Sequence, residues 1–152
     1  MTHSQRLTEL GITLPQVAAP VAAYVPAVQH AGLVWTSGQL PVRDGTMIST
    51  GLVGKDASVE DATAAARQCA LNAIAAAAAE VGGIDNLTRV VKVVGFVASD
   101  PSFTGQPQVI NGASELLAEI FGEVGAHARA AVGVASLPLN VSVEVEVVFA
   151  TE

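Results

Sequence analysis

The chain has 152 residues, of which 51% are hydrophobic and 14% are charged, so the composition predicts one globular domain with a substantial core and excludes a disordered chain. Fourteen acidic side chains outnumber seven Lys and Arg, without any basic run, which argues against a nucleic-acid-binding surface. A single cysteine excludes an internal disulfide, and the three scattered histidines lack the spacing of zinc ligands.

Residues 1–20 are expected to form a helical or irregular lead-in to a single domain that spans residues 1–152. Residues 11–42 contain no Asp, Glu, Lys or Arg, but four prolines interrupt the segment, so no membrane-spanning helix is expected there. The first ten residues lack the apolar stretch and cleavage site of a signal peptide. These features predict a soluble cytoplasmic protein without a membrane partner.

Two extended runs come next, Tyr24–Gln29 and Leu33–Ser37, with a turn between them. Asp44-Gly45 is a strong turn signal, so residues 33–42 and 46–50 are expected to pair as a hairpin. Trp35 has apolar neighbours on its strand and is expected to lie in the core.

A long helix is predicted from Ser58 to about Val81. The stretch SVED at its start has the form of a capping box, and Gly82-Gly83 provides the left-handed residue that commonly ends a helix. Alanine dominates the segment, which favours a helix that can approach a sheet closely. Cys69 lies among these alanines without a neighbouring cation, so we expect a buried and unreactive thiol.

The second half of the chain is predicted to contain a strand at 87–99, a loop, a helix at 108–121 ended by Gly122, and two closing strands within HARAAVGVASLPLNVSVEVEV, residues 127–147. The resulting order, β-β-β-α-β-α-β-β, predicts an α+β fold in which a mixed sheet carries two helices on one face.

Alternation along the closing strands predicts which side chains share a face. The face of the last strand that meets the helices is formed by Val141, Val143, Val145, Val147 and Phe149, and the uncovered face by Ser142, Glu144 and Glu146. The preceding strand has a face of Arg129 and small residues, namely Ala131, Gly133 and Ala135. A solvated sheet face usually carries Lys, Thr and Glu, so we expect this small-residue face to receive another subunit or a ligand.

Four stretches in order give the chain a resemblance to the RidA/YjgF family of enamine/imine deaminases, also described as endoribonuclease L-PSP. They are YVPAVQHAGLVWTSGQLP (24–41), ARQCALNAIAAAAAEVGGIDNLTRVVKVVGFV (66–97), INGASELLAEIF (110–121) and ARAAVGVASLPLNVSVEVEVV (128–148). The last matches the closing signature of the family: an arginine, an alternating strand, Leu-Pro and a Val-Glu-Val-Glu strand.

The resemblance implies a chorismate-mutase-like homotrimer with ligand clefts between neighbouring subunits. It further implies hydrolysis of a small carboxylate substrate, a 2-imino or enamine acid of the 2-aminoacrylate type, to a 2-keto acid and ammonia without a metal or organic cofactor. Arg129 matches the arginine that binds the substrate carboxylate, and Glu144 matches the glutamate that positions or activates water. Tyr24 and Ser37 match residues that line the cleft, and Asn111 matches an asparagine on the second helix.

The chain departs from the family pattern at several places. Ala131 replaces a common cysteine, Gly133 and Ser136 replace charged residues, Ala22-Ala23 replaces Gly-Pro, and the N-terminal lead and the loop around 101–107 are longer. These changes are typical of a divergent branch of the family.

Other interpretations remain open for the same residues. Arg129 could form a structural salt bridge to Glu144 or Glu146 that holds a trimer together, and the two glutamates could belong to a polar network at an interface. His127 is interpreted as a residue at the rim of the cleft. The alternative function is a non-catalytic trimeric protein that binds small carboxylates or a regulatory partner, while the acidic composition disfavours a ribonuclease.

Overall fold

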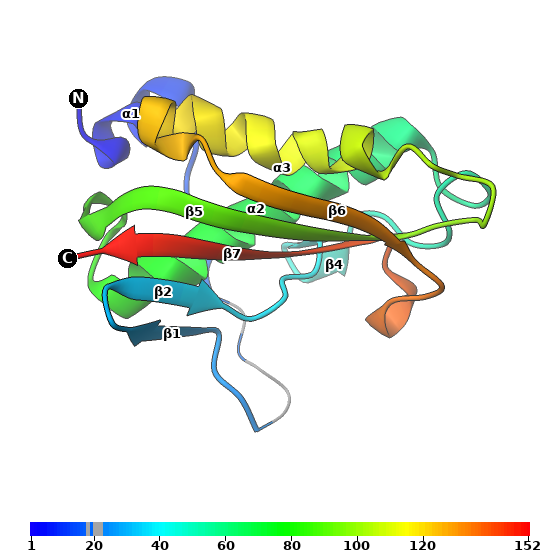
Figure 1. Cartoon of the computed structure of the whole chain (residues 1–152), viewed down its shortest axis with the longest axis horizontal. Coiled ribbons are helices and arrows are strands. Elements are labelled where there is room, and N and C mark those ends of the chain that lie inside the picture. Colours follow the sequence, from blue (N-terminus) through cyan, green and yellow to red (C-terminus); the bar gives the residue numbers. More distant parts are fainter. Residues whose placement is uncertain (18, 20–22) are drawn as a thin grey trace.

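A five-stranded mixed sheet backed by two long helices forms the fold of the computed structural model, which describes residues 1–17, 19 and 23–152 (Figure 1). Part of the predicted lead-in (residues 18 and 20) and the first residue of Ala22-Ala23 lie outside the described residues. The strands of the sheet are β1 (Ala27–His30), β2 (Leu33–Thr36), β5 (Leu87–Ala98), β6 (Ala128–Val134) and β7 (Val143–Thr151). Their spatial order is β1-β2-β7-β5-β6, in which β5 and β6 run parallel and the other neighbours antiparallel.

The helices begin and end at the signals in the sequence. The Ser58 hydroxyl accepts a hydrogen bond from the Asp61 amide at the start of α2 (Val59–Val81), and Gly82 ends that helix with a φ of 84°. The second long helix, α3 (Gln106–Phe121), begins two residues earlier than predicted. The lead-in contains α1 (His3–Leu10), and three short 3₁₀ turns complete the helical elements: η1 (Ile84–Asn86), η2 (Gly122–Gly125) and η3 (Pro138–Asn140).

The predicted hairpin forms in a shorter and separate version. Asp44 and Gly45 take positive φ values of 52° and 79° and connect β3 (Val42–Arg43) to β4 (Thr46–Met47) in their own two-stranded sheet. The prediction of one strand over 33–42 was wrong, because β2 ends at Thr36. The Asn72 side chain of α2 donates hydrogen bonds to the carbonyls of Leu40 (2.9 Å) and Val42 (3.1 Å), which directs this segment to the helix.

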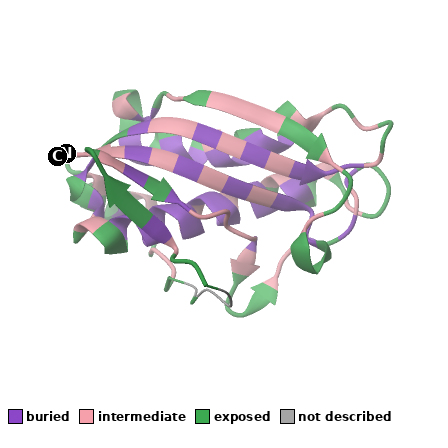
Figure 2. Ribbon diagram, turned by 60° about the horizontal axis from the view of Figure 1, so that its bottom comes forward, coloured by how far each residue is buried: buried purple, intermediate pink, exposed green. Residues whose placement is uncertain are grey.

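Helices α2 and α3 pack together and cover one face of the sheet, where buried side chains alternate with half-buried ones along β5 and β7 (Figure 2). Two glycines allow the elements to approach closely. A side chain at Gly95 of β5 would overlap Ile110 of α3, and one at Gly112 of α3 would overlap the Thr63 carbonyl of α2. The alanine-rich face of α2 is buried in the same core, and Cys69 is fully buried there, as predicted.

The face of the sheet without helices combines exposed apolar side chains with the charged Lys92, Glu144 and Glu146, and the prediction that Trp35 lies in the core was wrong. Val34 and Thr36 are buried on the helix side of β2, so the alternate residue Trp35 lies on the uncovered face with 51% of its surface exposed. Val28 and Val132 are also exposed, while Phe96 is half-buried. We call the surface formed by Val28, Trp35, Val94, Phe96, Val132, Glu144 and Glu146 the open face.

Strand β6 forms one edge of the sheet and contains no buried residue, in contrast to its neighbour β5. Across residues 1–17, 19 and 23–152, the helices are all too short or too polar to cross a membrane.

Substituting Gly112 tests the close contact between the two helices. We expect Gly112→Ala to lower the free energy of unfolding by about 1–3 kcal/mol, because the added methyl group must displace the backbone of α2. Thermal and denaturant unfolding measure the change, and Glu115→Ala on the exposed side of α3 serves as the control, with an expected effect within about 0.5 kcal/mol. An unchanged stability of Gly112→Ala would contradict the packing of α2 on α3.

Candidate functional site

Arg129 lies on the edge strand β6 and points to the helix side of the sheet. It pairs in register with the buried Val93 of β5, and residues in register share a face. Its Nη1 donates hydrogen bonds to Asn111 Oδ1 (2.8 Å) and Ser114 Oγ (3.2 Å), and its Nη2 donates to the Pro107 carbonyl (3.3 Å), all on α3. Three neutral acceptors therefore fix the orientation of the guanidinium.

The charge of Arg129 has no acidic partner within the described part of the chain. The ion pairs found there join Arg6 to Glu9 and Arg67 to Glu119. Arg129 is half-buried, so part of its donor fork faces outward. Hydrogen bonds to neutral groups leave the positive charge uncompensated, and a planar fork of donors matches a carboxylate. The arrangement can bind an anion.

Ser114 and His127 extend the hydrogen bonds around the guanidinium. His127 Nε2 lies 2.8 Å from Ser114 Oγ, and its Nδ1 lies 2.6 Å from the Gly125 carbonyl. The Gly125 carbonyl can only accept, so Nδ1 carries the proton in the neutral ring and Nε2 accepts from Ser114. His127 is therefore a half-buried support for Ser114. The sequence interpretation gave it only a place at the rim and did not include Ser114.

Glu144 lies on the open face of β7, opposite Phe96 of β5. Its side chain occupies the space beside Gly38, where any added Cβ would overlap the carboxylate. Burial raises the pKa of Glu144, and the negative charge of Glu146 on the same face raises it further. The site thus contains a carboxylate that holds a proton at higher pH than an ordinary glutamate.

Ser37 directly precedes Gly38, whose Cβ position the Glu144 carboxylate occupies, whereas Tyr24 lies in the segment before β1. The Ser37 hydroxyl donates to the Val25 carbonyl (2.6 Å), and its amide donates to the Pro26 carbonyl (2.8 Å), so it fixes the segment before β1 against the end of β2. Tyr24 is 51% exposed. Gly38, which the sequence interpretation missed, could have been found from its place directly after Ser37.

Four of the predicted residues and the two added by the structure, Ser114 and Gly38, form two groups that one chain does not bring together. The arginine group contains Arg129, Asn111 and Ser114, and the glutamate group contains Glu144, Ser37 and Gly38. Strands β2 and β6 are three strand spacings apart, about 14 Å, and Arg129 and Glu144 point to opposite faces of the sheet. Arg129 therefore forms no salt bridge to Glu144 or Glu146 among the described residues of one chain, and the alternative of such a bridge between subunits of a trimer stays a prediction.

The small-residue face of β6 lies on the helix side of the sheet, and its role as the surface that receives another subunit or a ligand stays a prediction. Ala131 and Gly133 point to the same side as Arg129, towards α3, and Ala131 packs against the core. The large apolar side chains that the sheet exposes lie on the open face.

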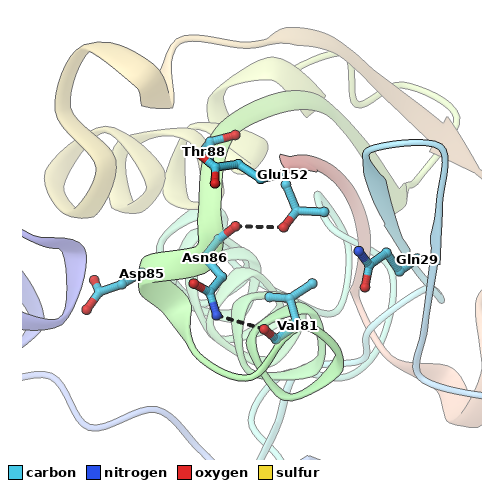
Figure 3. A pocket seen from close by; sticks show the side chains of 7 residues that line it. Gln29, Val81, Asp85, Asn86, Thr88 and Glu152 are labelled. Carbon is cyan, nitrogen blue, oxygen red and sulfur yellow. Dashed lines mark hydrogen bonds between the residues drawn. The ribbon is translucent and has the colours of Figure 1, made fainter.

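A separate hollow of about 320 Å³ lies where β1, β5 and β7 meet near the C-terminus, lined by Gln29, Asp85, Asn86 and Glu152 among others (Figure 3). Asn86 donates to the Val81 carbonyl and thereby closes the end of α2. None of the predicted site residues lines it. Within the described ranges, moreover, His, Cys, Asp and Glu side chains do not gather in groups of three that could hold a metal ion.

Comparison with known proteins gives one family and several relatives. Residues 4–151 match the family model described as "YjgF/chorismate_mutase-like, putative endoribonuclease". Protein TCP17 of Trypanosoma cruzi is 48% identical over 141 residues, which cover 92% of this chain and 88% of TCP17.

Solved structures have the same fold. A protein of unknown function from Agrobacterium tumefaciens is 47% identical with a TM-score of 0.91, and the match covers 99% of this chain and 94% of that one. A "putative endoribonuclease" from Shewanella oneidensis is 33% identical with a TM-score of 0.94, covering 99% of both chains. The more distant TdcF of E. coli, solved with bound serine, is 23% identical with a TM-score of 0.65 over 90% of this chain and 94% of that one, and the likeness shows the fold alone.

The raised pKa of Glu144 predicts an effect on stability that depends on pH. An acid whose pKa is higher in the folded state favours folding when protonated, so stability falls as pH rises from its unfolded to its folded pKa. We expect Glu144→Gln to raise the melting temperature at neutral pH and to change it little at pH values below the ordinary glutamate range. Glu115→Gln, at an exposed position of α3, controls for the loss of one charge. A Glu144→Gln variant less stable than wild type at neutral pH would contradict the assignment.

Proposed function

The chain belongs to the YjgF/chorismate mutase-like family, and from that membership we propose that it hydrolyses small 2-imino and enamine acids to 2-keto acids and ammonia in the cytoplasm. The observation that carries the proposal is the guanidinium of Arg129, which neutral acceptors hold in place while its charge stays unpaired within the described chain. A small substrate with a carboxylate next to its reacting carbon is the anion that this group would hold.

Arg129 binds the substrate carboxylate, and Asn111 and Ser114 position Arg129. Because the carboxylate and the imine carbon are adjacent in a 2-imino acid, fixing one end of the molecule also fixes the carbon that water attacks. An enamine such as 2-aminoacrylate enters the same reaction after it gains a proton at C3 and becomes an imine.

Glu144 acts on water as a general base. Its ionised carboxylate takes one proton from the water as the oxygen forms a bond to the iminium carbon, and it returns that proton to the nitrogen of the resulting carbinolamine. The C–N bond then breaks as the C=O bond forms, and the departing ammonia takes the remaining hydroxyl proton and leaves as ammonium. Water and the iminium acid are consumed, and the keto acid and ammonium are released. A raised pKa suits this role, because a carboxylate with a higher proton affinity is a stronger base near neutral pH.

The complete site is formed between two subunits of a homotrimer. The arginine group lies at the β6 edge, whereas the glutamate group lies on the open face, where β7 passes the segment after β2 in the interior of the sheet. A neighbouring copy that brings this part of its open face to β6 would unite the two groups, with Tyr24 and Ser37 lining the cleft. Two observations support a partner: β6 is an edge strand without buried residues, and the open face exposes Val28, Trp35 and Val132.

The family model and the Shewanella protein are described as putative endoribonucleases, and the charge of this chain favours a small acid over RNA. TdcF was solved with bound serine, and an amino acid has the same carboxylate and adjacent nitrogen as a 2-imino acid. The net charge of this chain is −7, which disfavours a ribonuclease because RNA phosphates require clustered cations. Binding of small acids without turnover would support the alternative of a non-catalytic carboxylate-binding protein.

Replacing Arg129 tests its role in binding the substrate carboxylate. We expect Arg129→Ala to reduce kcat/KM for 2-iminopropanoate by at least about 100-fold, because a charge-assisted pair of hydrogen bonds is lost. Keto-acid formation from enzymatically generated 2-aminoacrylate measures the rate. Arg89→Ala is the matched control, since Arg89 is an exposed arginine of β5 that donates to a backbone carbonyl, and its rate should equal that of wild type. Full activity in Arg129→Ala would refute the proposal that Arg129 binds the substrate carboxylate.

Mixing two inactive variants tests whether the site is shared. Arg129→Ala and Glu144→Gln are each expected to be inactive alone. Random mixing of equal amounts should restore about one quarter of wild-type activity, because one adjoining pair in four has both intact residues on the correct sides. The mixture is prepared by joint refolding, with each variant refolded alone as the control. If the mixture stays inactive while trimers form, both residues act within one chain and the shared site is wrong.

A further inference from the structure

A cavity of about 410 Å³ lies beside the same edge strand as Arg129. It is open to solvent and is lined by the end of β5, the loop before α3, the first residue of α3 and the second half of β6. Its walls include Ser99, Phe103, Gln106 and Gly133. Sequence analysis singled out Gly133 and this longer loop as departures from the family pattern, and the proposed reaction has not used either.

The cavity lies on the same edge strand as Arg129 and is linked to its guanidinium through the start of α3. Arg129 Nη2 donates to the carbonyl of Pro107, the residue that follows Gln106 in α3. Arg129, Ala131 and Gly133 point to the same side of β6. Between the guanidinium and the cavity, the strand therefore presents nothing larger than a methyl group.

Gly133 provides space at this position. Its φ lies outside the positive range in which glycine is favoured, and a Cβ there would lie 2.7 Å from Gln106 Nε2 and 3.2 Å from Ser99 Oγ. The backbone accepts any residue, but a side chain would compete with Gln106 for the wall of the cavity.

Gln106 gives the cavity a polar wall that can accept a hydrogen bond. Its Nε2 donates to Ser99 Oγ (3.2 Å) and to the Phe103 carbonyl (2.8 Å), while no hydrogen bond among the described residues uses its Oε1. That oxygen can accept from a ligand N–H or O–H. The lining also includes the carboxylate of Asp100 and no Lys or Arg, which disfavours an anionic ligand group.

We propose that this cavity receives the side chain of the substrate and that the preferred substrates are 2-imino acids with an uncharged side chain of glutamine-like length ending in a hydrogen-bond donor. The inference rests on the proposed function, since Arg129 must hold the carboxylate of the same molecule. Gly133 and Gln106 are then the residues that determine specificity.

Hydrolysis of four imines by the full-length protein tests the inference. An amino-acid oxidase generates the imines from glutamine, methionine, alanine and glutamate, and loss of each imine is followed in competition with a chemical trap. We expect kcat/KM for the glutamine-derived imine to exceed that for the glutamate-derived imine at least about tenfold. The two side chains have the same shape, but only the amide can donate a hydrogen bond to Gln106, and the carboxylate carries a negative charge. Equal values, or a preference for the alanine-derived imine, would overturn the inference and leave the proposed function intact.

Gly133→Val narrows the cavity and should lower the ratio of kcat/KM for the glutamine-derived over the alanine-derived imine by about tenfold. Thr46→Ile adds volume at an exposed position of β4, outside the cavity and the open face, and should leave that ratio unchanged. An unchanged ratio in Gly133→Val would show that the side chain lies elsewhere.

Calorimetry with carboxylates that do not react distinguishes a failure of the proposed function from a failure of the inference about the cavity. Glutaramate, which ends in an amide, should bind more tightly than glutarate or propionate, and Gly133→Val should abolish the difference. If no imine is hydrolysed, the proposed function fails, and this binding series alone decides the role of the cavity. Equal binding of the three acids would overturn it.

Discussion

The hydrogen bonds that hold the Arg129 guanidinium against α3 are the interaction on which the candidate site depends. Asn111, Ser114 and the Pro107 carbonyl orient the group without neutralising it, and His127 fixes the Ser114 hydroxyl. A buried salt bridge would have fixed the side chain as well, but it would have cancelled the charge that a ligand needs. Neutral acceptors keep the arginine both ordered and available.

The alternation of side chains along the strands and the order of the strands prevent a single chain from bringing Arg129 and Glu144 together. Arg129 and Glu144 point to opposite faces of one sheet, and two strands separate β6 from β2. No rearrangement of side chains brings the two groups together. The exposed edge strand and the open face are the surfaces that a second copy would cover, so the proposed chemistry and the proposed assembly depend on the same geometry.

Small residues serve two purposes in this fold. Gly95, Gly112 and the alanines of α2 bring the helices close to the sheet and to each other, which lets Asn111 and Ser114 of α3 reach the edge strand. Ala131 and Gly133 leave space beside Arg129 that longer side chains would fill. Tight packing in the core and open space at the edge thus come from the same residue types in different surroundings.

The sequence by itself determined the two long helices, because Ser58, Gly82 and Gly122 mark their ends locally, and it determined the buried and open faces of β7, because alternation is a local property of a strand. It also identified Arg129, Glu144 and Asn111 as candidates through the family resemblance. Only the tertiary structure decided that Trp35 is exposed, that the hairpin separates from the main sheet, and that Ser114, His127 and Gly38 support the site. These results depend on contacts between segments far apart in the chain, such as Asn72 with Leu40 and Arg129 with α3, and neither spacing nor periodicity encodes such contacts.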